Sequence, residues 1–250
     1  MGIPTTPTVR AALWLCALSA IAVSCAAPPI KPLPPAPSFR LAVLDFAVPS
    51  EWRDPVMPDK LKKERKGWWF GSRDIWRNPG YGRAAADALA REMNQLPFVH
   101  MVSRADVAYY MGAKLKLIRE TLDEQRRKLE KSDNLKDWQE AERIRALTDA
   151  DYDRLVETLP PREIGRELKV DRVLVGRVHE AYLAHNRTIH WYWSRVDIEA
   201  QLIDVESGKA LWSRRAPFSG NIASPSLLLE NAAKWMVEAM KNECFYAAAK

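Results

Sequence analysis

The sequence predicts an α/β (α+β) fold: one mixed β-sheet of about five strands, packed by helices, with an inserted charged helical hairpin. Two observations predict this class. Apolar runs of strand length stand in both halves of the chain, and segments with helical spacing of apolar residues lie between and after them. With 250 residues, 47% hydrophobic and 28% charged, the chain can bury a sizeable core and lacks the composition of a disordered or collagen-like protein.

Residues 1–24 are predicted to be a signal peptide. Arg10 ends a short basic region, and Ala11 to Val23 is a 13-residue apolar run, which is too short to span a bilayer. The run ends in Ala-Val-Ser-Cys, which resembles the bacterial lipobox. We therefore predict a lipoprotein, with cleavage before Cys25 and acyl chains such as palmitate on this residue. The alternatives are an ordinary secretory signal cleaved near Ala26 or Ala27 and a signal anchor.

A tether is predicted after the lipidated cysteine, over residues 25–38. It holds six prolines between Pro28 and Pro37, so it favours extended polyproline II over helix or sheet. Residue 26 is Ala, and in the enterobacterial sorting pattern that the lipobox resembles, the absence of Asp after the cysteine directs a lipoprotein to the outer membrane. We therefore expect a lipid-anchored protein on the periplasmic face of the bacterial outer membrane.

The folded domain is predicted over residues 39–250. Its first strand is the apolar run from Phe39 to Phe46. Residues 47–82 contain four prolines and four glycines, so only short regular elements fit there. A helix and a second strand follow, over residues 82–96 and 98–102.

A charged helical insertion is predicted at about residues 105–158. Apolar residues recur at helical spacing on two segments, separated by Ser-Asp-Asn at 132–134. The first stripe is Met111, Leu115, Ile118, Leu122 and Leu129, and the second is Leu135, Trp138, Ala141 and Ile144. Residues 114–148 hold ten basic and eight acidic side chains, which favours a solvated face of ion pairs over a nucleic-acid surface.

Three strands and a closing helix complete the domain, over residues 171–183, 187–205, 209–218 and 226–240. In the strand over 187–205, the apolar residues from Val196 onward occupy even positions, whereas Trp191 and Trp193 occupy odd ones. Either a β-bulge near Ser194 resets the register, or the first half of the strand projects beyond the core with aromatics on both faces. In the second case the strand offers an aromatic patch to another protein.

Four segments, in this order along the chain, resemble the periplasmic α/β domain shared by the curli-secretion lipoprotein CsgG, the N-terminal domain of TolB and the penicillin-binding-protein activator LpoB. They are LAVLDF, ADALAREMNQLPFVHMVSRADV, IGRELKVDRVLVGRV and IDVESGKALWS. The resemblance implies a periplasmic domain that serves envelope secretion or cell-wall synthesis. It also implies an alternative, a subunit of a CsgG-like oligomeric secretion ring.

Signals for catalysis are few. No Walker-type loop or Gly-x-Gly-x-x-Gly follows a strand, and no two of the four histidines stand two or four residues apart, so we expect no cofactor and no metal. Three cysteines are too few for a disulfide framework. We therefore expect a binding protein and not an enzyme. The rival hypothesis is a periplasmic hydrolase built around Asp45, at the end of the first strand.

The segment from Lys60 to Arg77 places seven basic residues beside four aromatic ones in a Gly-broken loop. This mixture suits an anionic interface, such as membrane headgroups, lipopolysaccharide phosphates or an acidic protein. Alternatively, the Trp side chains cover the sheet as a lid while the Lys heads stay in water. The residues predicted to form a partner or membrane surface are Lys62, Lys63, Arg65, Lys66, Trp68, Trp69, Phe70, Trp76, Trp191 and Trp193.

Together these features predict a lipid-anchored binding or assembly protein of the outer membrane, accessory to envelope secretion or cell-wall synthesis. Its expected partners are the membrane, through the lipid anchor, and other envelope proteins. Further copies of the chain are partners in the ring alternative. Nucleic acid is not an expected partner, because the net charge of +6 is spread over a chain that also carries many acids.

Overall fold

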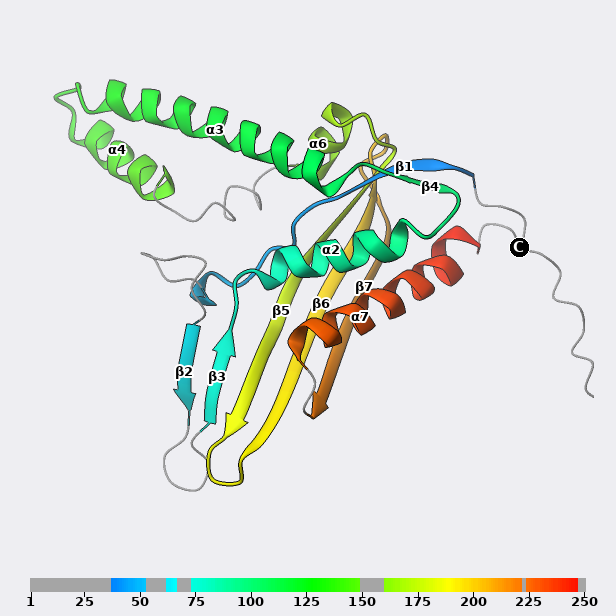
Figure 1. Cartoon of the computed structure of the whole chain (residues 1–250). Helices are drawn as coiled ribbons and strands as arrows, with labels where there is room; N and C mark the ends of the chain where they lie inside the picture. Colours follow the sequence, from blue (N-terminus) through cyan, green and yellow to red (C-terminus); the bar gives the residue numbers. More distant parts are fainter. Residues whose placement is uncertain (1–36, 53–61, 67–72, 149–159, 222–223, 247–250) are drawn as a thin grey trace, which may run out of the picture. The chain divides into compact units, whose positions relative to one another are not determined.

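The structure, a computed structural model, describes residues 37–52, 62–66, 73–148, 160–221 and 224–246 (Figure 1). Residues 35–250 form one compact unit, which contains both hydrophobic clusters of the described residues. This unit therefore carries the core that it needs to fold. The predicted signal peptide and Cys25 lie outside the described residues.

Within the described residues, seven strands form one mixed sheet, so the predicted fold class is confirmed. The strands are β1 (Phe39–Val43), β2 (Lys62–Lys66), β3 (Arg73–Arg77), β4 (Val99–Met101), β5 (Arg172–Asn186), β6 (Trp191–Asp204) and β7 (Ala210–Asn221). β1 pairs in parallel with β4 and β5, and the other pairs are antiparallel. One edge of the long β5 pairs first with β1 and then with β3, while its other edge pairs with β6, which pairs in turn with β7.

The prediction of about five strands missed β2 and β3, which lie in the segment expected to hold only short elements. Each has five residues, and β2 has the sequence KKERK, which carries no alternation of apolar and polar residues. Their hydrogen bonds come from pairing with each other and from the pairing of β3 with β5. Such strands depend on a distant partner, so the local sequence does not predict them.

Two helices, α2 (Tyr81–Met93) and α7 (Pro225–Met240), cover one face of the sheet and enclose the main core (Figure 1). Small side chains such as Ala85 and Ala232 let the helices lie close to the strands. The Ser224 side chain accepts a hydrogen bond from the backbone N–H of Leu227 and so caps the start of α7.

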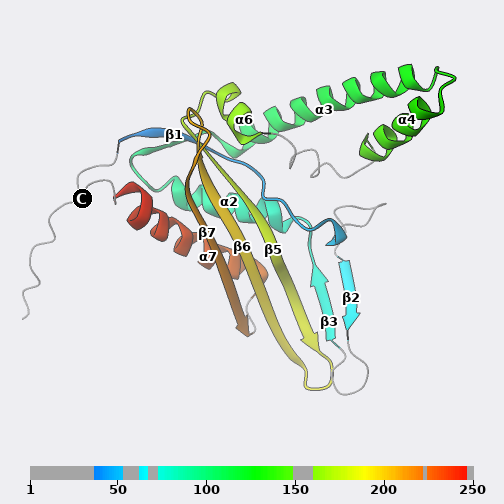
Figure 2. The ribbon, with the colours of Figure 1, turned by 180° about the vertical axis from the view of Figure 1, so that it is seen from behind.

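On the opposite face of the sheet, seen in Figure 2, the described helices cover one end. There α3 (Arg104–Leu129) and α6 (Pro161–Glu167) contribute to a second cluster. Its members include Val107, Ile164 and Val205. A Cβ atom on Gly165 would lie 2.4 Å from the side chain of Val205, so only glycine lets α6 approach the sheet this closely.

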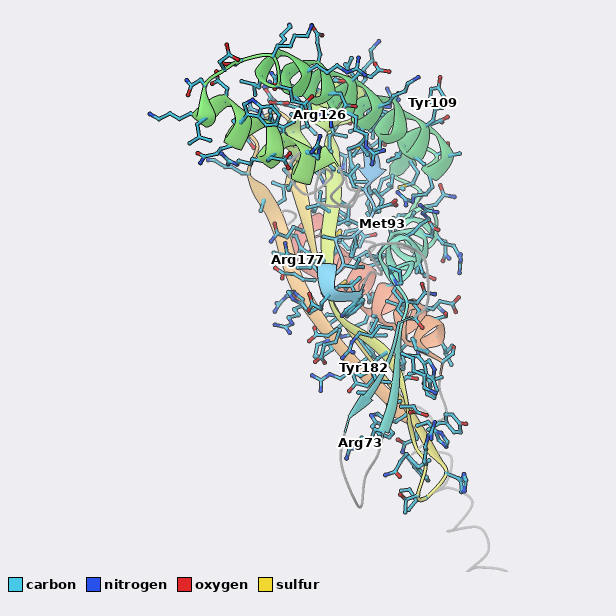
Figure 3. All side chains as sticks on the ribbon, turned by 90° about the vertical axis from the view of Figure 1, so that its left-hand side faces the viewer. Arg73, Met93, Tyr109, Arg126, Arg177 and Tyr182 are labelled. Carbon is cyan, nitrogen blue, oxygen red and sulfur yellow. The ribbon has the colours of Figure 1, made fainter. Side chains whose placement is uncertain are left out.

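The predicted helical hairpin forms from α3 and α4 (Leu135–Thr148), as Figure 3 shows. Leu115, Ala141 and Ile144 are buried, as their stripe predicts. Leu135 and Trp138 were expected on the same stripe, but both are exposed. The indole of Trp138 donates to the backbone oxygen of Ser132, so this side chain packs on the turn between the helices.

Candidate functional site

The strands β2, β3, β5 and β6 continue past the helices, and we call this part the distal end. It comprises residues 62–66, 73–77 and 182–193, including the turn Arg187–His190. In β5 and β6, the residues that belong to the main core stop at Ala181 and Val196. Figures 1 and 2 both show the hairpin of β5 and β6 extending beyond α2 and α7. Neither α2 nor α7 covers the distal end, and the short helix η1 (Ser50–Trp52) reaches only Arg77 at its border.

Aromatic side chains lie on both faces of the distal end, because β6 keeps its alternation. Ser194 and Val196 lie on the same side as the core, so Trp193 points the other way. β6 pairs residue by residue with β7 from Trp193 to Leu202. The bulge lies in β5 instead, where His179 is the extra residue. Of the two alternatives, the bulge near Ser194 is therefore wrong, and the projecting strand with aromatics on both faces is confirmed.

The core-side face of the distal end carries a row of stacked rings. Asp74, His185 and Tyr192 pair across β3, β5 and β6 and so share this face. The rings of His185 and Tyr192 stack with centroids 4.1 Å apart, and Trp76 stacks on His185 at 6.5 Å. The Lys63 ammonium lies 5.2 Å from the centroid of Trp76, within the range of a cation–π contact.

The other face carries two arginines stacked on aromatic rings. The guanidinium carbon of Arg73 lies 5.1 Å from the centroid of Trp193. That of Arg77 lies 5.9 Å from the centroid of Tyr182 and 6.0 Å from that of Trp52. A guanidinium over the face of a ring can still donate through its N–H groups to a phosphate or carboxylate oxygen.

Asp74 ties the turn between β5 and β6 to the neighbouring hairpin of β2 and β3. Arg187 Nε donates to Asp74 Oδ2 over 2.7 Å, and Lys63 Nζ lies 3.3 Å from the same oxygen. The side chain of Asp74 is only 3% exposed. Burial by itself would raise the pKa of this carboxyl, but the bonds from Arg187 and Lys63 hold the pKa below its ordinary value of 3.8. A charged Asp74 thus holds the two hairpins together.

Three large side chains stay in contact with solvent at this end. Ile189 in the turn is 65% exposed, Trp191 45% and Tyr192 44%. The distal end also holds seven basic residues against two acidic ones. It therefore combines an apolar turn, exposed aromatic rings and positive charge.

The structure brings together part of the predicted surface. Lys63, Trp76, Trp191 and Trp193 all lie at the distal end. Lys62, Arg65 and Lys66 belong to strand β2, but their side chains lie outside the described residues, as do Trp68, Trp69 and Phe70 altogether. Cys25 also lies outside them, so its lipidation stays a prediction.

Several residues of this end were missed by the sequence analysis: Arg73, Arg77, Tyr182, His185, Arg187 and Tyr192. Arg73 and Arg77 stand within the basic segment Lys60 to Arg77, and Tyr192 stands between Trp191 and Trp193. Their closeness in sequence to predicted site residues is the signal that could have found them. What joins these segments is the pairing of β3 with β5, across more than one hundred residues of sequence.

Comparison with protein-family models gives no match, and comparison with curated proteins gives none either. The resemblance to CsgG, TolB and LpoB therefore stays a prediction. Solved structures show a partial likeness. A PelC dodecamer from Paraburkholderia phytofirmans is 13% identical, with 83% of this chain and 93% of that chain covered and a TM-score of 0.41.

Two further solved structures are similar to the same extent. The lipoprotein GNA1162 from Neisseria meningitidis is 16% identical, with coverages of 82% and 99% and a TM-score of 0.37. Protein XCC0632 from Xanthomonas campestris, described with the family model DUF330, is 10% identical, with coverages of 84% and 85% and a TM-score of 0.38. At these TM-scores the function has to be argued from this chain's own residues.

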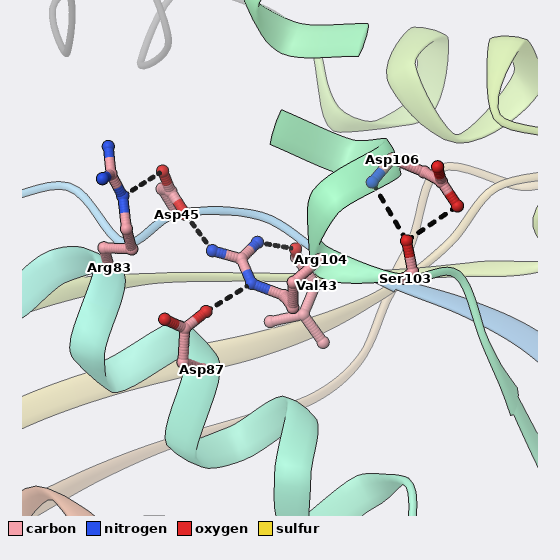
Figure 4. A network of polar contacts seen from close by, with 7 residues as sticks. All are labelled: Val43, Asp45, Arg83, Asp87, Ser103, Arg104 and Asp106. Carbon is pink, nitrogen blue, oxygen red and sulfur yellow. Dashed lines mark hydrogen bonds and ion pairs between the residues drawn. The ribbon is translucent and has the colours of Figure 1, made fainter. Parts of the chain in front are cut away.

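Asp45, the residue of the hydrolase hypothesis, belongs to an ion-pair network (Figure 4). Arg104 donates to Asp45, to Asp87 at 2.8 Å and to the backbone oxygen of Val43 at 2.5 Å. Arg83 Nε lies 3.8 Å from the other oxygen of Asp45. Two guanidinium groups thus occupy this carboxylate, and the network ties β1 to the starts of α2 and α3.

A second polar network lies on the uncovered face of β5, β6 and β7. Arg215 donates twice to Asp197, at 2.7 and 2.6 Å, and these bonds hold the pKa of Asp197 below its ordinary value of 3.8. His179 lies 2.9 Å from Glu199.

Within the described ranges, no group of three or more His, Cys, Asp or Glu side chains is placed to hold a metal ion. Among all the residues that the structure describes, no helix is long and apolar enough to cross a membrane.

Proposed function

We propose that this chain is a lipid-anchored binding protein on the periplasmic face of the bacterial outer membrane, accessory to envelope secretion or cell-wall synthesis. It acts by binding and not by catalysis. The observation that carries the proposal is the distal end, where exposed aromatic rings and stacked cations stand clear of the helices. The lipobox at Cys25 supports the anchor and the compartment.

The geometry of the distal end suits binding because its side chains are held in place before a partner arrives. The ring stack of Trp76, His185 and Tyr192 and the Asp74 ion pairs fix rotamers that would otherwise lose entropy on binding. Aromatic and arginine side chains held in this way supply most of the free energy in many interfaces.

Fractionation of cells tests the anchor. The full chain should sediment with outer membranes, and the Cys25→Ser variant should not, because it lacks the thiol that receives the diacylglyceryl group. A variant that still sediments with outer membranes after a high-salt wash contradicts lipidation at Cys25.

Site-specific photo-crosslinking in cells tests the binding surface. A photoreactive phenylalanine at position 192 should give covalent adducts, whereas the same residue at position 235 should give none. Trp235 is a matched control, because it is exposed to a similar extent but lies on α7, away from the distal end. Equal adduct patterns at both positions would remove the distal end as the binding surface.

A further inference from the structure

We propose that the partner of the distal end is an anionic lipid surface, and that the end of the β5 and β6 hairpin enters the interfacial layer of the membrane. This rests on the proposed function and names the partner of the same site. Three features of the distal end support it: aromatic rings on both faces, an apolar residue at the turn, and cations level with the rings.

The distribution of rings over both faces favours a membrane over a protein. Trp76 and Tyr192 lie on the core-side face, and Trp191 and Trp193 lie on the other. A folded protein that docks on one face leaves the rings of the other face in water. A lipid interface surrounds the end of a hairpin and so contacts both faces at once. Trp and Tyr are also the residues that concentrate at membrane interfaces.

The turn presents an apolar residue at the end of the hairpin. Ile189 is the most exposed of these side chains, and His190, which follows it, has a backbone φ of 51°. Trp191, the first residue of β6, lies two residues further along the chain, so at most about 7 Å separates the two Cα atoms. Amphipathic elements at membrane surfaces enter about 5–10 Å into the headgroup boundary, so the turn and the first ring fit this depth.

The cations stand level with the rings and in the turn next to them. Arg73 pairs with Asn186, which pairs with Trp191, so these three residues form the last paired row before the turn. Lys63 lies over Trp76, and Arg187 stands in the turn itself. When the rings lie at the headgroups, these cations reach the phosphate groups. A basic residue near an anionic membrane strengthens binding by about fivefold at low salt.

Vesicle co-sedimentation tests the proposal. Residues 35–250 form a compact unit with its own core, so this segment is used without the lipid anchor. The vesicles contain phosphatidylglycerol and phosphatidylcholine in equal parts, or phosphatidylcholine alone. We expect binding to the anionic vesicles, weaker binding in high salt as the charges are screened, and little binding to phosphatidylcholine.

Paired variants locate the contact. Ile189→Ser with Trp191→Ala should reduce binding by at least about tenfold. Leu227→Ser with Trp235→Ala should leave it unchanged, because these exposed side chains lie on α7, outside the distal end. Arg73→Gln should reduce binding by about fivefold, and Arg143→Gln on α4 should not. Thermal melts check that every variant is folded.

Two results would overturn the proposal: wild-type protein that does not bind anionic vesicles at low salt, or equal losses for the distal and the α7 variants. If vesicle binding fails while position 192 still forms adducts with one protein in cells, the binding function stands and the lipid surface is wrong. If position 192 forms no adducts and the vesicles bind nothing, both are wrong.

Discussion

Gly176 in β5 is a site where one added methyl group should show how tightly β5 packs against Phe46 and β6. A Cβ atom there would lie 2.2 Å from the ring of Phe46 and 2.4 Å from the backbone oxygen of Glu199 on β6. Phe46 is buried in the main core, and the oxygen belongs to the paired strand, so neither can yield by a simple rotation. The structure thus predicts that Gly176→Ala destabilises the domain.

The expected loss follows from the cost of overpacking. Inserting a methyl group into a packed core typically costs about 1–3 kcal/mol. For a domain of this size, each kcal/mol lowers Tm by about 2–4 °C. A thermal melt of residues 35–250, followed by circular dichroism, should therefore show a fall of several degrees for Gly176→Ala.

Gly112→Ala is the matched control for this substitution. Nothing lies within 4 Å of a Cβ atom at Gly112, which stands in the interior of α3. Alanine is favoured over glycine in a helix by about 1 kcal/mol, so this variant should melt at a higher temperature than wild type. An unchanged or higher Tm for Gly176→Ala would refute the described contact between Phe46 and β5.

Three further predictions concern the networks and the hairpin. Arg104→Ala should lower the free energy of unfolding by about 1–3 kcal/mol in a denaturant titration, because it removes the donor shared by Asp45, Asp87 and the Val43 carbonyl. The control Arg91→Ala should cost less, because Arg91 forms an exposed ion pair with Glu230. Arg215→Leu should destabilise the domain at pH 7 and less so near pH 3. The native pKa of Asp197 is lowered, so its ion pair stabilises the fold above the unfolded pKa of 3.8, and this stabilisation is lost as the pH falls through the native pKa. A difference in Tm that does not depend on pH contradicts this prediction. Replacing residues 115–148 by a Gly/Ser loop should leave a cooperative melt with little loss of Tm, because Lys114 keeps its ion pair with Glu167. A loss of cooperative unfolding would show that the helical hairpin is part of the core.

Elements with their own apolar pattern were predictable from the sequence. The stripes of α2 and α7 and the long runs of β5 and β6 carry the periodicity of their structure, because each buries one face in the main core. β2 and β3 carry no such pattern, since they depend on pairing with each other and with β5. Leu135 and Trp138 follow the helical period but lie near the turn of the helical hairpin, where no described element covers them.

The candidate site was predictable in kind but not in arrangement. The change of apolar face along β6 left two alternatives, and only the pairing shows that the bulge falls at His179 and not near Ser194. The stacking of Arg73 on Trp193 joins residues from β3 and β6, which do not pair with each other. Contacts of this kind depend on the order of strands in the sheet, which single-sequence patterns do not contain.

The central claim is that the distal end meets an anionic membrane, and a fluorescent probe at the turn tests it most directly. In residues 35–250 with Cys244→Ser, a single cysteine at position 189 or at position 206 is labelled with an environment-sensitive dye. Glu206 is exposed in the turn between β6 and β7, at the opposite end of β6 from Ile189. On addition of phosphatidylglycerol vesicles, the dye at 189 should shift to the blue and be quenched by lipids spin-labelled near the headgroup, while the dye at 206 should not change. The same response at both positions, or a response at 206 alone, would contradict the claim.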